Sequence, residues 1–391
     1  MSQANRSLRD SIVSSAGRLL ARAFGDGTAP AGFRPKNVLV IKTCCIGDVL
    51  MATPMLSALR EAFPAAKISL AVGSWSKSVV EGNPDIDDII DCGSIAGGRR
   101  FSLAEYFGVV RQLRVRQFDC CFVLERSALL TALPWIAGIP VRVGLDSGGR
   151  GFSLTVRVAV PDRRHEAELY LDTVRAIGYE PVGPRMKFVP SQADRARADA
   201  ALAACGDGPI VAVHPGGGVN PGMRLVAKRW PAERYAAVAD RLVASGCHVV
   251  LVGDAGDREV VSAVKRHMRS AGVDLAGQLT LGELGAVLAR CRLAVANDTG
   301  PMHLAVAVGT PVVAIFGPSD PLVYGPYGQS DAVASSGLAC SPCFKHGRTP
   351  RCIEPKCMSS LSVEAVWALV EARLQAPRTG STPPAGASGA R

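Results

Sequence analysis

The stretch that most constrains the fold is residues 294–318, which read AVANDTGPMHLAVAVGTPVVAIFGP. A short apolar run ends at the polar corner NDTG, and Pro301 follows, whose fixed φ and missing N–H suit the first turn of a helix. Thr299 is then the N-cap of a helix over residues 301–308, which a Gly-Thr-Pro triplet ends. Residues 312–316 are apolar without polar alternation, as in strands buried on both faces. The stretch therefore predicts strand, turn, short helix and strand in a parallel α/β sheet.

The turn within this stretch is a candidate ligand site. In open parallel sheets, ligands bind beyond the carboxyl ends of the strands, where helix N-terminal N–H groups favour phosphate. Asp298 offers an acceptor for a ribose or base donor, and the amides of Thr299 and Gly300 suit a phosphate. His303 follows about one helical turn later and faces the same ligand. The alternative interpretation is an ordinary capped turn with a packed histidine.

Composition narrows the class of protein. The chain has 391 residues, of which 48% are hydrophobic and only 5% aromatic, which is typical of an α/β protein of two or three domains. Its net charge of +10 indicates an anionic partner, and because no nucleic-acid-binding motif is present, we expect no nucleic acid. No run of eighteen apolar residues and no apolar signal core occur, so we expect a cytoplasmic protein.

The N-terminal residues carry apolar side chains at helical spacing among arginines. Two interpretations stand. The first is a helix that lies on an anionic membrane surface, peripheral to the inner face of the cytoplasmic membrane, and the second is a helix docked on the protein's own body or a partly ordered leader. We divide the whole chain into five segments: a basic amphipathic leader and linker (1–33), an N-terminal Rossmann-like acceptor domain (34–189), a C-terminal Rossmann-like nucleotide-sugar domain (190–360), a C-terminal helix (361–374) and a disordered tail (375–391).

The two large segments open alike, with NVLVIK at residues 37–42 and PIVAVH at residues 209–214, each followed by a glycine-bearing loop. This likeness predicts two similar α/β halves that face each other. Apolar runs predict further strands at residues 67–72, 88–91, 120–124, 142–145 and 248–253. Helical periodicity predicts helices at residues 48–63 (interrupted by Pro54), 75–80, 103–113, 128–137, 165–177, 231–245, 257–270, 281–290 and 362–374.

Four of the twelve cysteines are clustered as C-x2-C-x8-C-x4-C, at Cys340, Cys343, Cys352 and Cys357. Four thiolates within eighteen residues suit a tetrahedral structural zinc or iron site. The alternative is a reduced, metal-free loop.

Several motifs together resemble the family 9 glycosyltransferases, whose best known members are the ADP-heptose:lipopolysaccharide heptosyltransferases. The resemblance covers residues 36–374, and its motifs are KTCCIGDVL at 42–50, HPGG at 214–217, KRWP at 228–231, NDTGPMH at 297–303 and FGP at 316–318. Two departures stand out. The loop at residues 216–227 is longer than in the lipopolysaccharide enzymes, and Cys44-Cys45 replaces the small hydroxyl residues common in the family.

The resemblance implies a GT-B fold, with two Rossmann-like domains facing across a cleft, and an inverting transfer that needs no metal or other cofactor for catalysis. Asp48 matches the family's proposed general base, and Lys228 matches the lysine near the donor diphosphate. The expected substrate-binding residues are Thr43, Gly47, His214, Gly216, Asp298, Thr299, Gly300 and His303. An N-cap role for Asp48 and a surface position for Lys228 are the structural alternatives.

The leading hypothesis is therefore a glycosyltransferase that moves heptose or a similar sugar from a nucleotide-sugar donor, ADP-heptose, to a lipopolysaccharide core or other surface-glycan acceptor. A lipid-linked acceptor would place the enzyme at the inner membrane surface. Two alternatives remain: a heptosyltransferase directed to a protein acceptor, and a non-catalytic nucleotide-sugar-binding protein. The oligomeric state stays open.

Overall fold

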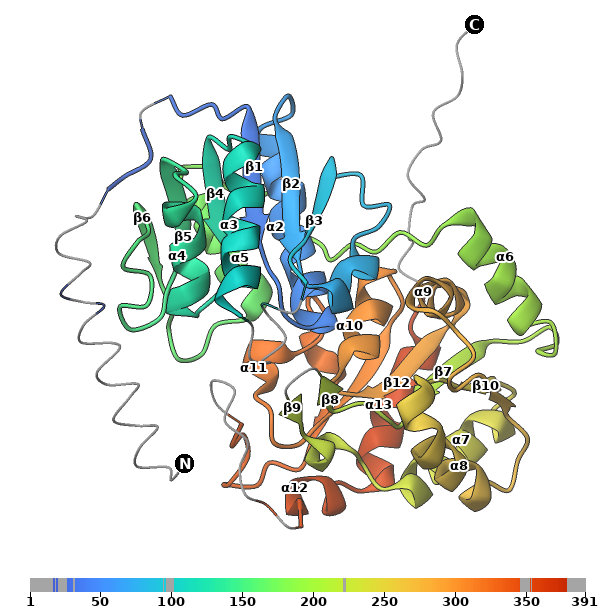
Figure 1. Ribbon diagram of the computed structural model, residues 1–391. Helices are drawn as coiled ribbons and strands as arrows, with labels where there is room; N and C mark the ends of the chain where they lie inside the picture. The colour runs from blue at the N-terminus through green and yellow to red at the C-terminus, as the bar shows by residue number, and fades with distance from the viewer. Residues whose placement is uncertain are drawn as a thin grey trace, which may run out of the picture.

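The computed structural model describes residues 17, 19, 27–30, 32–93, 95, 102–220, 223–344, 352 and 354–377. Two six-stranded sheets dominate it, with strand orders β3-β2-β1-β4-β5-β6 and β11-β10-β7-β12-β13-β14 (Figure 1). All neighbouring strands within both sheets run parallel. The predicted α/β fold of two Rossmann-like halves is thus confirmed.

In the N-terminal half, helices cover both faces of the sheet. Alternate residues of the central strand belong to different cores: Val38 and Val40 pack with α2 and α5, whereas Leu39 and Ile41 pack with α3 and α4. The elements are β1 (Asn37–Ile41), α2 (Ile46–Ala62), β2 (Lys67–Val72), a 3₁₀ turn (Ser74–Val79), β3 (Asp88–Asp91), α3 (Leu103–Val115), β4 (Cys120–Val123), α4 (Ala128–Ile136), β5 (Val141–Asp146), β6 (Val156–Ala159) and α5 (Glu166–Arg175). Strand β6 was not predicted, although Val156 and Val158 alternate with Arg157 as in a half-buried strand.

The C-terminal half repeats this plan. Its helices and strands are α6 (Gln192–Ala201), β7 (Ile210–His214), the antiparallel hairpin β8 (Val219–Asn220) and β9 (Met223–Arg224), α7 (Ala232–Ala244), β10 (His248–Leu251), α8 (Arg258–His267), β11 (Val273–Asp274), α9 (Leu281–Arg290), β12 (Leu293–Asn297), α10 (Gly300–Ala307), β13 (Val312–Phe316), α11 (Pro321–Tyr324), β14 (Val333–Ser335), α12 (Lys356–Ser359) and α13 (Val363–Gln375). The sequence did not predict α6 or the short strands at the hairpin and the sheet edges.

Helix α2 corrects two predictions. It begins at Ile46, with Cys45 as N-cap, so Asp48 lies inside the first turn and is not the cap. It also continues through Pro54 instead of being interrupted there. Proline has no N–H to donate to the carbonyl four residues earlier, but the Thr53 hydroxyl donates to that carbonyl, of Leu50, at 2.6 Å. The orphaned acceptor is therefore satisfied and the helix stays intact.

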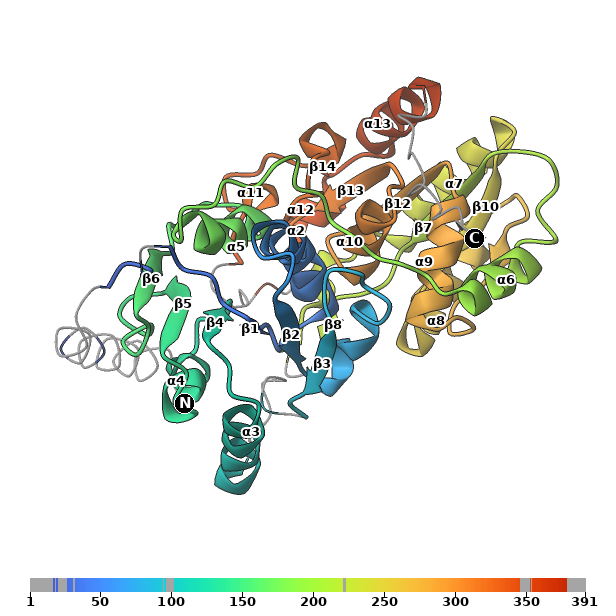
Figure 2. The same ribbon diagram turned by 90° about the horizontal axis from the view of Figure 1, so that it is seen from above.

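The two halves meet through their inner helices. One continuous apolar core includes side chains of α2 and α5 from the first half and of α6, α9 and α10 from the second. Helix α10 packs against α2, and Figure 2 shows both between the two sheets. The N-terminal ends of these two helices consequently face one another where the strands of both sheets end.

Predictions at the chain ends fall mostly outside the described residues. Of the basic leader, the structure describes little more than Gly17, Leu19 and residues 27–30, and of the tail only residues 375–377. Within the described parts, no helix combines the length and the apolar character needed to cross a membrane.

Candidate active site

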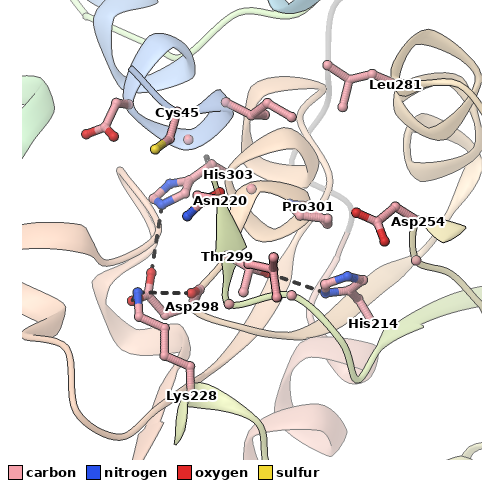
Figure 3. A pocket seen from close by; sticks show the side chains of 18 of the residues that line it. Cys45, His214, Asn220, Lys228, Asp254, Leu281, Asp298, Thr299, Pro301 and His303 are labelled. Atoms are coloured by element: carbon pink, nitrogen blue, oxygen red, sulfur yellow. Dashed lines mark hydrogen bonds and ion pairs between the residues drawn. The ribbon is translucent and has the colours of Figure 1, made fainter. Parts of the chain in front are cut away.

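A cavity of about 580 Å³ lies between the two halves. The loop before α2 and the first turn of α2 form one wall, and the loop after β7, the turn between β12 and α10, and the start of α9 form the other. Figure 3 shows this arrangement, with Cys45 on the first wall and Lys228, Asp298, Thr299 and His214 opposite. Each half was predicted to bind a ligand at its own sheet edge. The two edges instead line one shared cavity.

Asp48 projects from the first turn of α2 and lines the cavity. Its Oδ1 lies 4.0 Å from the Nζ of Lys42, which also lies 3.9 Å from Oε1 of Glu125 and 5.3 Å from the ring centroid of Tyr170. Burial alone would lower the pKa of Lys42, but the charges of Glu125 and Asp48 and the Tyr170 ring outweigh it and raise that pKa well above its ordinary value. The buried Lys42 is therefore charged, and its ammonium lies on the buried side of the Asp48 carboxylate.

Thr43 was expected to contact substrate, and the structure places it behind the cavity wall. It is buried, and both its N–H (2.7 Å) and its hydroxyl (2.8 Å) donate to Oε1 of Glu125. Thr43 does not line the cavity, and its hydrogen bonds join the segment after β1 to Glu125, two residues after the end of β4. Glu125, which the sequence analysis missed, is thus the buried acceptor that orders this loop, together with Lys42.

Lys228 is not a surface lysine. Its Nζ donates to Oδ2 of Asp298 at 2.6 Å, and both side chains are largely buried, with 13% and 5% exposed. The same ammonium lies 5.4 Å from the ring centroid of Phe344. The sequence named Lys228 and Asp298 as separate donor contacts, whereas the structure brings them together as one ion pair in the cavity wall.

His214 and Thr299 belong to a second polar network. Nδ1 of His214 lies 3.3 Å from the Thr299 hydroxyl, and its Nε2 lies 3.3 Å from Oδ2 of Asp257. Burial alone would raise the pKa of Asp257, but hydrogen bonds from His214 and from the Gly217 amide outweigh it and lower that pKa to about 2. Because an ionised carboxylate only accepts, Nε2 of His214 carries the hydrogen. Asp257 was missed, since nothing local marks the acid at the start of α8 as a partner of β7.

The glycines of the HPGG segment have different roles. Gly216 was expected to bind substrate, but a Cβ there would lie 2.2 Å from the Asp257 carboxylate, and Gly216 does not line the cavity. Gly217 does line it, with φ of +84°, and a Cβ at Gly217 would lie 2.4 Å from Cγ2 of Thr299. The close approach of this loop to Asp257 and Thr299 therefore requires both glycines.

Asn297, at the end of β12, organises the second wall. It is fully buried, and its Oδ1 accepts from the Trp230 amide at 3.1 Å and from the Tyr235 hydroxyl at 2.9 Å. Its Nδ2 donates to the carbonyls of Pro215 at 2.9 Å and Gly216 at 3.1 Å. One side chain thus ties together three motifs that are distant in the sequence.

His303 and Gly47 mark the contact between the halves. A Cβ at Gly47 would lie 2.8 Å from Cδ2 of His303, so glycine is needed where α2 approaches α10. Burial lowers the pKa of His303 to about 4, with only partial compensation from Asp298, whose Oδ1 lies 4.0 Å from Nε2. Among the described residues, no group bonds the buried Nδ1 of His303. This neutral imidazole lines the cavity with unused hydrogen-bonding capacity.

Two helix N-termini open into the same cavity. Thr299 is the N-cap of α10 as predicted, but its side chain makes no capping bond, and neither does Cys45 at α2. Gly300 begins α10 and lies against Ile46, since a Cβ there would be 3.3 Å from Cγ2 of Ile46. First-turn amides without side-chain caps favour an anion, and the α10 terminus lies next to Lys228 and Asp298.

The four clustered cysteines differ in burial. Cys340 and Cys352 are exposed, Cys343 is half-buried and Cys357 is buried. Burial, followed by the charges of the other cluster cysteines, raises the pKa values of Cys343 and Cys357, so the four thiols are electrostatic neighbours. Within the described part of the chain, however, the only three metal-ligating side chains with all ligand atoms within 4.8 Å of one another are Cys44, Cys45 and Asp48.

Comparisons with known proteins agree with this architecture. The family model for glycosyltransferase family 9 (heptosyltransferase) matches residues 107–353. Lipopolysaccharide heptosyltransferase 2 of Escherichia coli K12 is 28% identical over 305 residues, covering 73% of this chain and 84% of that protein. The crystal structure of a family 9 glycosyltransferase from Veillonella parvula superposes with a TM-score of 0.74 at 26% identity, covering 87% of this chain and 97% of that one.

The structure of the E. coli ADP-heptose lipopolysaccharide heptosyltransferase II shares the fold, with a TM-score of 0.68 at 23% identity and coverage of 86% of this chain and 98% of that one. The family match extends over more than half of the chain and includes the second wall of the cavity, from His214 to Phe344. This chain belongs to glycosyltransferase family 9.

Proposed function

We propose that this glycosyltransferase moves heptose from ADP-heptose to a lipopolysaccharide core or related surface-glycan acceptor. The observation that carries the proposal is the shared cavity, which Asp48 lines from the first half and Lys228 and the α10 N-terminus line from the second. The related enzyme of E. coli is named a lipopolysaccharide heptosyltransferase, which favours this acceptor class over a protein acceptor. We infer that residues 34–189 bind the acceptor and residues 190–360 the donor.

In the proposed reaction, the acceptor hydroxyl oxygen attacks the anomeric carbon of the heptose. The bond from that carbon to the acceptor oxygen forms as the bond to the diphosphate oxygen breaks, and Asp48 takes the hydroxyl proton as general base. Lys42 keeps the carboxylate oriented, because its ammonium lies 4.0 Å from Asp48 on the buried side. Attack opposite the leaving group inverts the anomeric centre.

The departing ADP gains negative charge, and the second wall supplies positive charge without a metal. Lys228 and the first-turn amides of α10 are the proposed stabilising groups. His303 is neutral at physiological pH, because its pKa is about 4, and it serves as a hydrogen-bonding group to sugar or phosphate. No step requires a cofactor.

The direct test is Asp48→Asn, assayed by ADP release with ADP-heptose and a heptose-deficient lipopolysaccharide acceptor. Turnover should fall about 10²-fold or more, as expected for loss of a general base, while ADP affinity by calorimetry stays unchanged. Asp207→Asn, at an exposed position outside the cavity, is the control and should behave as wild type. Undiminished turnover in Asp48→Asn would remove Asp48 from the mechanism.

The two alternative functions predict other outcomes of the same assay. A protein-directed enzyme would release ADP only with a polypeptide acceptor. A non-catalytic binding protein would bind ADP-heptose without release in the presence of either acceptor.

For the cysteine cluster, we propose a structural zinc or iron bound by Cys340, Cys343, Cys352 and Cys357. Mutual proximity of the thiols and the contact of Cys357 with the Gly317 turn support it, since a Cβ at Gly317 would lie 3.1 Å from the Cys357 Sγ. Protein purified without chelator should contain about one equivalent of metal, and any single serine substitution should release it, because four ligands close a structural site. Metal-free protein of full stability would reject the proposal.

We also propose that the first half docks on an anionic membrane surface, where a lipid-linked acceptor would reside. Helices α3 and α4 lie side by side, and the Tyr106 hydroxyl of α3 donates to the Leu129 carbonyl of α4 at 2.8 Å. Arg111 is exposed on α3. Large apolar side chains exposed on the two helices are Leu103, Phe107, Val115, Leu129 and Trp135. Exposed apolar and aromatic residues with arginines are typical of interfacial binding.

Vesicle cosedimentation tests this docking surface. Wild type should bind phosphatidylglycerol vesicles and not phosphatidylcholine vesicles, and Phe107→Ser with Val115→Ser should abolish binding without loss of ADP affinity. Val182→Ser is the control, since Val182 is equally exposed but lies away from α3 and α4. Unchanged binding of the double variant would exclude this surface.

A further inference from the structure

We propose that Cys44 and Cys45 form a reversible disulfide that switches the enzyme off by displacing Asp48. The two sulfur atoms already lie 3.1 Å apart, and both residues line the cavity. This inference rests on the proposed role of Asp48, because it assigns a regulatory modification to the same loop.

A second pair of adjacent cysteines, Cys120 and Cys121, differs from Cys44 and Cys45 in the positions of its side chains. Cys120 and Cys121 lie in strand β4, where successive side chains point to opposite faces. Accordingly Cys120 belongs to the core beneath α2, and Cys121 to the core beneath α3 and α4. Both are fully buried. Cys44 and Cys45 lie in a loop, are partly exposed, and have sulfurs in contact.

The backbone at this loop leaves little freedom for a disulfide. Adjacent Cα atoms lie about 3.8 Å apart across a trans peptide, whereas bridged cysteines usually have Cα atoms about 4.4–6.8 Å apart. Because the peptide bond fixes the separation of adjacent Cα atoms, ring closure must distort this peptide and the dihedral angles beside it. Cys45 is the N-cap of α2, so the change acts directly on the helix turn that carries Asp48.

Ile46 and Gly47, which follow Cys45, have no room to move toward the second half. Gly47 already approaches His303 so closely that a Cβ would lie 2.8 Å from its ring, and Ile46 lies against Gly300. Asp48 depends on its 4.0 Å approach to Lys42 for orientation. A shift of the α2 N-terminus therefore separates the general base from Lys42 and from the acceptor hydroxyl.

The chemistry balances with a low-molecular-weight disulfide as oxidant. One thiolate attacks the small disulfide, forms a mixed disulfide and releases one small thiol. The neighbouring sulfur then attacks the mixed disulfide, forms the Cys44–Cys45 bond and releases the second small thiol. Both protein thiol protons leave, the protein loses two electrons, and the small disulfide gains them. A strained bond of this kind is readily reduced by a dithiol, which makes the switch reversible.

The same atoms suggest a cation site, since the two sulfurs and the Asp48 carboxylate lie within 4.8 Å of one another. The Lys42 ammonium, 4.0 Å from Asp48, opposes a second positive charge there. We therefore assign the pair to disulfide formation.

The experiment compares the full-length enzyme in oxidised and reduced glutathione, followed by dithiothreitol. The tryptic peptide of residues 43–60 contains both cysteines, and after oxidation it should be lighter by two hydrogens. Turnover should fall about 10²-fold, the lower end of a general base's contribution, and should recover fully with dithiothreitol. Cys44→Ser and Cys45→Ser should each show the same turnover in oxidised as in reduced glutathione. Cys205→Ser should lose turnover in oxidised glutathione as the wild type does.

Three outcomes would overturn the switch: no oxidised peptide, a stable glutathione adduct in place of the internal disulfide, or an oxidised peptide with full turnover. Inhibition by zinc that both serine variants resist, without any disulfide, would assign the pair to metal binding instead. Absence of ADP release by the reduced wild type would reject the proposed function alone. The peptide mass decides the disulfide independently of turnover.

Discussion

The ammonium of Lys228 lies 2.6 Å from the carboxylate of Asp298, and both side chains are largely buried in the cavity wall. Asp298 therefore holds the Lys228 ammonium in place within the cavity wall. We propose that the donor diphosphate contacts this same ammonium.

Removing one partner of this pair should destabilise the protein strongly. Lys228→Met and Asp298→Asn should each lower the free energy of unfolding by about 3 kcal/mol, because each leaves a buried group unpaired. The double variant should lose less than the sum of the two. The exposed pair Arg241 and Glu364, whose nearest nitrogen and oxygen lie 3.0 Å apart, is the control, and its coupling should stay below about 1 kcal/mol. Additive losses at Lys228 and Asp298 would contradict the coupling.

Lys228→Met should also weaken ADP binding about tenfold or more, since a hydrogen bond to a charged group contributes about 1.5–3 kcal/mol. Isothermal calorimetry measures this directly. Arg241→Met, far from the cavity lining, should leave ADP affinity unchanged. Equal affinities of wild type and Lys228→Met would remove Lys228 from the donor site.

Lys42→Met should lower turnover about tenfold while leaving ADP affinity unchanged, because Lys42 contacts Asp48 and not the second wall. Without the ammonium, Asp48 loses the positive charge that lies 4.0 Å from its carboxylate, so kcat should fall while the donor KM stays the same. Lys77→Met, at a half-exposed lysine outside the cavity, is the control. Wild-type kcat in Lys42→Met would mean that Lys42 does not act through Asp48.

Gly47→Ala should destabilise the contact between the halves by about 1–3 kcal/mol, since its Cβ would lie 2.8 Å from the His303 ring. Turnover should fall with it. Adding His303→Ala should restore part of the stability by making room. Gly108→Ala is the matched control: no atom lies within 4 Å of its added Cβ, so this exposed helical position should gain about 0.5–1 kcal/mol. Thermal unfolding distinguishes the two, and a neutral Gly47→Ala would refute the close contact.

The pKa of His303 predicts how stability depends on pH. It is about 4 in the folded protein against an ordinary 6.5, so between these values the unfolded chain binds the extra proton. The free energy of unfolding should therefore fall as pH drops from about 6.5 to about 4, in total by about 3 kcal/mol. His303→Gln should lack this decline, and His248→Gln should retain it. Urea titrations at several pH values measure the difference, and parallel curves for wild type and His303→Gln would rule it out.

Local sequence signals sufficed for most elements. The strands at residues 67–72, 88–91 and 312–316 and the helix at 281–290 begin and end where predicted. Their apolar runs, caps and glycine or proline stops lie within the element itself, so no distant contact is needed to recognise them. Strand β6 and helix α6 also carry local signals, which went unused: Val156 and Val158 alternate with Arg157 in β6, and Ser191 and Asp194 form a capping box at the start of α6.

The motifs also identified which residues gather at the cavity, including Asp48, Lys228, Asp298, Thr299 and His303. What each side chain bonds to was decided by tertiary structure. Thr43 and Gly216 carry the same motif signal as the cavity residues, yet they face inward, toward Glu125 and Asp257.

The sequence by itself determined the two parallel sheets, because periodicity and turn chemistry act over a few residues. It also determined the residue types at their carboxyl edges. Only the tertiary structure decided which side chains of the site contact each other. Examples are Lys228 with Asp298, 70 residues apart, and His214 with Asp257, 43 residues apart. These contacts depend on strand order and on the close approach of α2 to α10. The absence of a Cβ at Gly47 permits that approach.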